Sequence, residues 1–246
     1  FRYSSASEVV SPINAFRSAD YRISAELAES MKGSTSTFNR TSNHTPDQRL
    51  AIYGPSMTAK GLPFGYSSTG LSDAGFSTSG TSTINVKMRG PETPIQLMTA
   101  GYTFLNRAEA AQRGWTTENA AAMLTSGIVL NYNALDARFA TTLSPAAAAY
   151  AAARVADAAT VGFAQVIGEE KWVALFMNGF DAWAEQRRTG YPNLKPAPNA
   201  VNGGKIPTRI IYPTEEANFN SANYKDAVSR LVPAEDTNTA LFWWLQ

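Results

Sequence analysis

The sequence predicts an all-α protein made of tetratricopeptide-like helix pairs, with long irregular loops and a loop-rich C-terminal tail. Apolar residues recur at three- and four-residue spacings in several segments, and capping residues precede some of these segments. Between them lie stretches rich in Ser, Thr, Gly, Asn and Pro that show no sustained period of either kind. Because 44% of the 246 residues are apolar, the chain can bury a sizeable core.

The N-terminal third is predicted to be a helix followed by a long loop. Apolar residues at mixed three- and four-residue spacings predict a helix over residues 5–32, and Gly33 is expected to end it. Residues 34–91 are predicted to be a loop-rich insertion, because their composition changes and no periodicity remains. Loops of this length inside a compact domain are uncommon and are often functional.

A helical block over residues 93–190 follows. Thr93 can cap its first helix, Pro94 suits the first helical position, and Gln96 stands where a capping box needs it. This helix is expected to run from residue 93 to about residue 113 and to stop at Gly114.

The second and third helices of the block are predicted from similar signals. Thr116 or Thr117 is expected to cap a helix over 117–133, which packs antiparallel to the first helix as one tetratricopeptide-like unit. The full repeat consensus is absent. An alanine-rich helix is predicted from Ser144–Pro145 to about residue 159.

The fourth helix, residues 163–188, is predicted to be the longest. Trp172, Phe176, Phe180 and Trp183 recur at spacings of four, four and three residues, so they would form one apolar stripe. Aromatic faces also stack on sugar rings, but the helical spacing favours a buried stripe. We therefore expect these four side chains to belong to the core.

The tail, residues 191–246, is predicted to be irregular. It is rich in Pro, Asn and Gly, with a short helix expected near residues 223–231. The chain closes with Leu241, Phe242, Trp243 and Trp244, which we expect to be buried.

Composition and charge exclude several classes of function. The 21 basic and 20 acidic residues leave a net charge of +1 with no run of like charges, which disfavours nucleic-acid binding. Without cysteine, and with His44 as the single histidine, the sequence predicts no metal site, catalytic triad or cofactor. No run approaches the roughly 18 apolar residues that a membrane-spanning helix needs. The low share of charged residues, 17%, suits neutral polar ligands such as sugars.

Two adjacent carboxylate pairs, Glu169–Glu170 and Glu215–Glu216, raise the question of glycoside hydrolysis. That chemistry needs two carboxyl groups about 5 to 10 Å apart that face one bond. Neighbouring residues on a helix point about 100° apart, so neither pair converges on a bond. The sequence therefore predicts a protein that is not an enzyme.

Three arginines and one glutamate have structural explanations. Arg187 and Arg188 could pair with an anionic ligand group, since guanidinium groups bind carboxylate and phosphate well. Their place in the last predicted helical turn favours a structural role, because the helix dipole stabilises cations there. Arg209 and Glu215 are expected to be tied into the packing of the tail.

The candidate ligand-binding residues are four aromatics in or beside the loop-rich insertion. Tyr53, Phe64, Tyr66 and Phe76 lie among Gly, Ser and Pro, where no helical core needs them. Binding residues concentrate on loops that a rigid scaffold holds. We expect ligand contacts from this group, although some of its members must anchor the loop itself.

Several motifs occur in the order and at the spacing of one known family. The chain is similar to the SusD/RagB family over roughly residues 30–246. The motifs are DQRLAIY at 47–53, LPFGY at 62–66, LMTAGYTFLNRAEAAQRGW at 97–115, EKWVALFMNGFDAWAEQRRTGYPNL at 170–194, GGKIPTRIIYPTEEANFNSANY at 203–224 and the terminal FWW.

This resemblance implies a mostly helical binding protein that covers a SusC-type TonB-dependent barrel transporter as a lid and holds a glycan or peptide against it. Family members are about twice this length and begin with a lipoprotein signal, a lipidated cysteine and further helix pairs. The chain is therefore expected to be the C-terminal part of a single SusD-like domain, lipid-anchored on the extracellular face of a bacterial outer membrane. The alternative is a structural or assembly subunit of an outer-membrane complex, with the same fold and no nutrient binding.

Overall fold

The computed structural model describes residues 3–4, 9–17 and 21–245. Within these residues the chain has ten α-helices and no β-strand, which confirms the predicted all-α fold. The chain divides into two compact units. We call residues 1–64 and 68–193 the helical unit, and residues 65–67 and 194–246 the tail unit.

The first predicted helix, residues 5–32, is wrong as a single element. A short 3-10 helix, η1 (Pro12–Arg17), precedes an extended stretch, and only α1 (Ala25–Lys32) is α-helical. The extended stretch is hydrogen-bonded to the loop-rich insertion: the Ile23 N–H donates to the Ser82 carbonyl at 3.0 Å. Ser24 then starts α1 by accepting a hydrogen bond from the Leu27 N–H. Residues 5–8 and 18–20 of the prediction lie outside the described residues.

The end of α1 leads into residues 34–91. Gly33 ends α1 with φ 64°, a left-handed conformation that glycine adopts readily. Residues 34–91 are largely irregular, with three short helical segments: α2 (Leu50–Tyr53), α3 (Ser68–Asp73) and the 3-10 helix η2 (Val86–Arg89).

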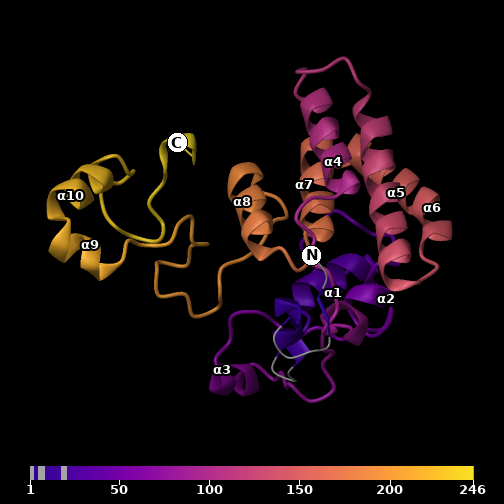
Figure 1. Ribbon diagram of the computed structural model, residues 1–246, viewed down its shortest axis with the longest axis horizontal. Helices are drawn as coiled ribbons and strands as arrows, with labels where there is room; N and C mark the ends of the chain where they lie inside the picture. Colours follow the sequence, from indigo (N-terminus) through magenta and orange to yellow (C-terminus); the bar gives the residue numbers. More distant parts are fainter. Residues whose placement is uncertain (1–2, 5–8, 18–20, 246) are drawn as a thin grey trace. The chain divides into compact units, whose positions relative to one another are not determined.

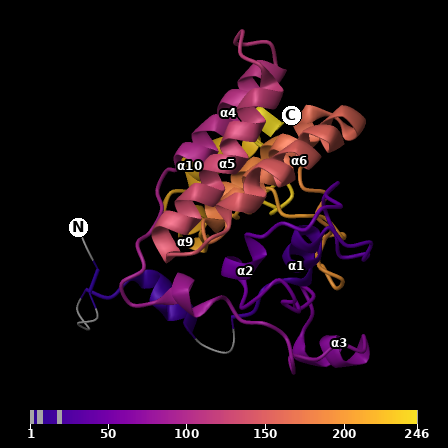
Figure 2. The ribbon, with the colours of Figure 1, turned by 90° about the vertical axis from the view of Figure 1, so that its right-hand side faces the viewer.

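The predicted antiparallel helix pair is present, with different ends. Its helices are α4 (Ala100–Gln112) and α5 (Ala120–Phe139), which lie side by side in both ribbon views (Figures 1 and 2). Thr99 caps α4 by accepting from the Tyr102 N–H at 3.1 Å. Thr93 is instead buried, and its hydroxyl donates to the Lys87 carbonyl at 3.1 Å. The expected helix start at Thr93 is therefore wrong.

The region from residue 144 to residue 189 contains three helices instead of two. The η3 turn (Ser144–Ala146) leads into α6 (Ala147–Val161), as expected, and Figure 2 shows α6 beside α5. The predicted single helix over 163–188 is wrong, because it breaks into α7 (Phe163–Ala174) and α8 (Gly179–Thr189). The longest helix is α5, with 20 residues.

The break between α7 and α8 also divides the predicted aromatic stripe. Met177 in the connecting turn has φ 73°, a conformation that does not continue a right-handed α-helix. Trp172 and Phe176 are half-buried against the core, whereas Phe180 is 77% exposed. Trp183 is half-buried, with the Arg187 guanidinium 4.1 Å from the centre of its ring. The four residues therefore do not form one buried stripe.

The helical unit has two hydrophobic clusters. One joins α1, α2 and the insertion to the ends of α5 and α7, and the other fills the space between α4, α5, α6 and α7. Leu143 packs against both. The largest fully buried apolar or aromatic side chains of the first cluster are Ile23, Met31, Leu50, Ile52 and Tyr53, and those of the second are Leu105, Leu124, Ile128 and Tyr132.

The tail unit contains α9 (Thr214–Phe219) and α10 (Ser221–Ser229), where one short helix was expected. Leu241 pairs with Val232 in an isolated antiparallel bridge. The expected burial of the terminal aromatics is wrong for Trp243, which is 80% exposed. No helix in the described part of the chain is long and apolar enough to cross a membrane.

Candidate functional site

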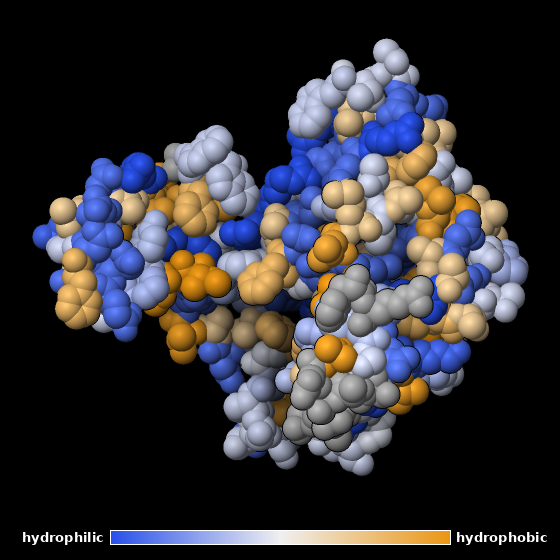
Figure 3. All heavy atoms as spheres, in the orientation of Figure 1, coloured by the Kyte–Doolittle hydropathy of each residue, from blue (hydrophilic) through white to orange (hydrophobic). Residues whose placement is uncertain are grey.

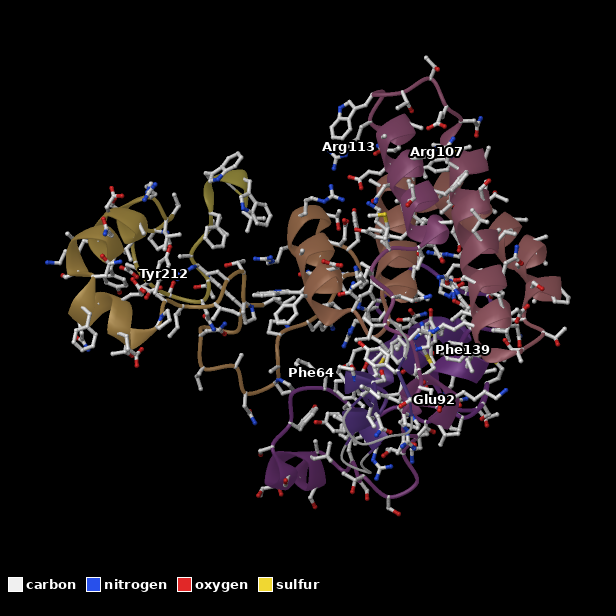
Figure 4. All side chains as sticks on the ribbon, viewed as in Figure 1. Phe64, Glu92, Arg107, Arg113, Phe139 and Tyr212 are labelled. Carbon is white, nitrogen blue, oxygen red and sulfur yellow. The ribbon has the colours of Figure 1, made fainter. Side chains whose placement is uncertain are left out.

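The four predicted ligand-binding aromatics differ in exposure and surroundings. Phe64 is 64% exposed and lies in the helical unit, where Figure 4 labels it, whereas Tyr66 is half-buried in the tail unit. Phe76 is half-buried and meets the Phe38 ring edge-on, with the ring centres 5.8 Å apart. Of the four, Phe64 presents the most open aromatic surface.

Tyr53 requires a correction. Its side chain is 2% exposed, its hydroxyl donates to the Val173 carbonyl at 3.0 Å, and its ring stacks on Phe176 at 4.4 Å. Tyr53 therefore joins α2 to α7 in the core and has no surface to offer a ligand. Sequence reasoning missed this because the short helix α2 carries no periodicity of its own.

A buried ionic network lies where α2, α5, α6 and α7 meet. The Arg49 guanidinium donates to Asp47 at 2.7 Å and to Glu170 at 2.6 Å, and all three side chains are essentially inaccessible. Asn131 on α5 accepts from the same guanidinium at 2.9 Å. Tyr132 donates its hydroxyl to Asp47 at 2.7 Å. Buried charges are tolerated when they are paired and hydrogen-bonded in this way.

The adjacent Glu169 and Glu170 serve the same network. Arg154 on α6 donates to Glu169 at 2.6 Å and to Glu170 at 2.9 Å, and Ser42 donates its hydroxyl to Glu169 at 2.7 Å. The hollow beside these groups measures only about 10 Å³, which is no more than one water needs. No glycosidic bond could reach this pair, so its role is structural.

A second ionic cluster fixes α8 to α4 and α7. Glu109 on α4 accepts from Lys171 at 2.5 Å and from Arg188 at 2.5 and 2.6 Å. Arg188 also pairs with Glu185 at 2.7 Å, which confirms its expected structural role. Burial alone would raise the pKa of Glu109, but the hydrogen bonds from Arg188 and Lys171 outweigh it and lower that pKa to about 2.

Two expectations for the tail have different outcomes. Arg209 is buried and pairs with Asp236 at 2.5 Å, so it is tied into the packing of the tail unit as predicted. Glu215 is exposed in the first turn of α9, where its charge suits the helix dipole.

A hollow in the helical unit lies beside an extended segment that we call the strap, residues 90–99. Its volume is about 150 Å³, well above the roughly 10 to 15 Å³ that a cavity needs to hold one water. Residues 95–99 of the strap form one wall and the α7–α8 turn, residues 174–178, forms another. The remaining lining includes Ile13, Tyr102, Arg138 and Asp181.

The rim of the hollow is apolar and exposed. Leu97 and Met98, which line it, are 88% and 80% exposed. Figure 3 shows apolar groups among polar ones on the face in view, without one continuous apolar surface. The apolar residues between Pro94 and Thr99 were predicted to be part of a helix. In the structure they belong to the non-helical strap.

Among the described residues that line this hollow, Arg138, at the end of α5, is the one basic residue. Its guanidinium lies 4.7 Å from the centre of the Phe139 ring and donates from Nη2 to the Pro94 carbonyl. Arg138 also lines a second, more open hollow of about 280 Å³ together with Glu92 and Phe139, which Figure 4 labels. Burial lowers the pKa of Arg138 from its ordinary value, yet an arginine remains protonated in a protein.

The comparison with protein families identifies one family. The SusD-like family described as "Starch-binding associating with outer membrane" matches residues 1–213. No curated protein matches the chain. This match rests on the sequence of the chain. A separate comparison of three-dimensional structures finds proteins with the same fold.

Three solved structures illustrate the likeness. A chitin-binding protein is 25% identical, with a TM-score of 0.72, over 92% of this chain and 50% of its own. Two SusD homologues from Bacteroides fragilis NCTC 9343 are 20% and 24% identical, with TM-scores of 0.76 and 0.75, over all of this chain and 57% and 56% of theirs. The chain thus spans about half the length of the structures it matches.

Proposed function

The chain belongs to the SusD-like family, and from that premise we propose that it contributes to binding a nutrient, a glycan or a peptide, at a bacterial outer membrane. The match over residues 1–213 is the observation that carries this proposal. A 25% identical structure is described as a chitin-binding protein, which makes a chito-oligosaccharide a first ligand to test. The function is binding and not catalysis, because the family is one of binding proteins and Glu169 and Glu170 are held in ion pairs.

The ligand contacts that we propose come from two places. One is the hollow beside the strap, which combines apolar walls with a few polar groups, as small-molecule sites do. The other is the group of aromatics Phe64, Tyr66 and Phe76, of which Phe64 offers the largest exposed ring. Stacking of a sugar ring on such an aromatic face adds affinity without requiring charge.

The partner and the location follow from the same proposal. A SusC-type barrel transporter would carry the chain as a lid, with a lipid anchor outside these residues and the binding surface on the extracellular side. The family description names association with the outer membrane, which supports this location.

The alternative is an assembly subunit that keeps the fold and the barrel partner but binds no nutrient. The burial of Tyr53 favours this alternative, because one of the four aromatics that were expected to contact a ligand cannot do so. The exposure of Phe64 favours the binding function. The two functions differ in whether isolated protein binds any oligosaccharide or peptide.

Isothermal titration of the 246-residue chain with chito-oligosaccharides, malto-oligosaccharides and a mixed peptide pool tests the proposal. Saturable binding of at least one ligand class is expected. Absence of heat with every class, in protein that shows a cooperative thermal transition, would favour the assembly subunit.

A further inference from the structure

Arg138 is only partly buried, and its partners differ from those of the fully buried arginines. Arg49, Arg154 and Arg209 each pair with at least one carboxylate. Among the described residues Arg138 has no ion pair, and its Nε, like that of Arg209, is enclosed without a hydrogen-bond partner. A guanidinium that is partly removed from water normally acquires an anionic partner, because its charged N–H groups are expensive to leave unsatisfied.

Glu92, which lines the more open hollow beside Arg138, is exposed and forms no ion pair with it, and two other nearby carboxylates are engaged elsewhere. Asp136, two residues earlier on α5, accepts from Thr141, Leu143 and Ser144 at 2.7 to 2.8 Å. Asp181, the carboxylate in the lining of the hollow, accepts from the Asn178 side chain at 2.6 Å. The position of Arg138 in the last turn of α5 accounts for a positive charge there, but not for the hollow beside it.

The hollow supplies what a carboxylate-bearing ligand needs. Arg138 provides a permanent charge with N–H donors to spare, since its hydrogen bond to the Pro94 carbonyl occupies Nη2 alone. Gln96, Thr99 and Asn178 line the same space with amide and hydroxyl groups that suit the hydroxyl or amide groups of the rest of the ligand. A volume of about 150 Å³ suits one charged sugar or one side chain better than an oligomer.

We propose that this hollow receives the carboxylate of an anionic nutrient, with Arg138 as its charged anchor. The inference rests on the proposed nutrient-binding function and narrows its ligand class. The carboxylate can belong to an acidic sugar or to an acidic amino-acid side chain, and the test distinguishes these sources.

The direct test uses acetate as the smallest probe. The 246-residue chain is titrated with sodium acetate and, at equal ionic strength, with sodium chloride, while the backbone amide NMR signals of Gln96 and Thr99 and the Nε–H signal of Arg138 are followed. Saturable shifts specific to acetate are expected. Arg138→Gln should weaken acetate binding at least tenfold, and Asp181→Asn should strengthen it because a like charge is removed from the lining.

Arg107→Gln is the matched control, because it removes the same charge from α4 at a residue that does not line the hollow. It should leave acetate binding unchanged. Equal shifts with acetate and chloride, or equal acetate affinity in Arg138→Gln and the wild type, would overturn the inference. If Arg138→Gln does not fold, the wild-type titration and Arg138→Lys, which keeps the charge, still decide the question.

Monomer pairs then separate this inference from the proposed function. Binding of glucuronate over glucose indicates the sugar source, and binding of N-acetylglutamate over N-acetylglutamine indicates the peptide source; both support the inference. Equal binding of the charged and neutral members would overturn the carboxylate preference and leave nutrient binding intact. Acetate binding without binding of any sugar, oligosaccharide or peptide would support the anion site and contradict the nutrient-binding function.

Discussion

Arg49 lies wholly inside the helical unit, where its charge is balanced by Asp47 and Glu170. Its guanidinium also lies 5.2 Å and 5.4 Å from the ring centres of Tyr132 and Tyr150. One residue thus holds together the insertion, α5, α6 and α7. A buried ion pair is not by itself evidence of high stability, but removing one partner leaves an uncompensated charge in the interior.

Arg49→Ala should therefore lower the free energy of unfolding by roughly 3 to 5 kcal/mol, because Asp47 and Glu170 would lose their shared cation. Urea denaturation followed by far-UV circular dichroism measures the change. Arg107→Ala is the matched control, since Arg107 pairs with Glu118 at the protein surface, and its midpoint should stay close to that of the wild type. Equal midpoints for both variants would show that the Arg49 network is not required.

The ionisation of Glu109 should make the free energy of unfolding depend on pH. Its pKa is lowered to about 2 in the folded protein, against an ordinary value of 4.5. A lowered carboxyl pKa stabilises the folded state above the unfolded pKa, and this contribution disappears as the pH falls towards the folded pKa. At neutral pH Glu109→Gln should lose roughly 2 to 3 kcal/mol. The difference from the wild type should shrink between about pH 4.5 and pH 2 in parallel urea titrations; a difference independent of pH would contradict this account.

At the scale of the elements, α4 and α5 pack closely because glycines face each other. A Cβ on Gly101 would lie 2.9 Å from the Gly127 carbonyl oxygen and 3.0 Å from the Asn131 backbone nitrogen. Backbone atoms cannot move aside as a flexible side chain can, so this position excludes even a methyl group without displacing a helix.

Gly101→Ala should consequently destabilise the protein by about 1 to 3 kcal/mol, although alanine is the better helix former. Gly179→Ala, at the start of α8, is the control: no atom lies within 4 Å of its added Cβ, so stability should be unchanged or slightly raised. Thermal unfolding of the two variants provides the measurement. If Gly101→Ala unfolds at the wild-type temperature, the α4–α5 pair is looser than the contacts indicate.

Periodicity identified most of the helices but not all of their ends. Residues 163–188 keep an apolar period across two helices, and the break depends on Met177 adopting a left-handed conformation that side-chain spacing does not reveal. Thr93 and Thr99 are both acceptable caps by type, but the Thr93 hydroxyl donates to the Lys87 carbonyl six residues earlier, whereas the Thr99 hydroxyl caps α4. Sequence reasoning therefore found the elements wherever their apolar faces fixed them, and failed at boundaries that depend on backbone conformation and on the choice between possible hydrogen bonds.

Over the whole chain, several motifs in a fixed order predicted the family correctly. No single residue or motif predicted the hollow beside the strap. The motifs at 47–53 and 170–194 matter for the fold because they supply Asp47, Arg49 and Glu170 to one buried network. The hollow beside the strap joins residues 13, 95–99, 102, 138, 174–178 and 181, and no short motif contains that combination. The site could not be predicted because it arises only when these segments fold together.

In the membrane, the chain is proposed to form a complex with a barrel transporter. A lid on a barrel should copurify with that barrel, so mild-detergent extraction from native membranes should yield a large outer-membrane protein in a fixed ratio to the chain. Within that complex, Phe64→Ala with Tyr66→Ala should weaken nutrient binding several-fold, because stacked aromatics contribute to ligand affinity. The barrel should still copurify, because two side chains are a small part of an interface large enough to hold a lid.

Phe219→Ala is the control for this pair, since Phe219 is an exposed aromatic on α9 outside the proposed ligand contacts. It should change neither nutrient binding nor copurification. Unaltered binding of every glycan and peptide by the double variant would remove Phe64 and Tyr66 from the site. A chain that is extracted without any barrel would contradict the lid arrangement itself, whereas loss of the barrel only in the double variant would move these aromatics from the ligand site to the partner interface.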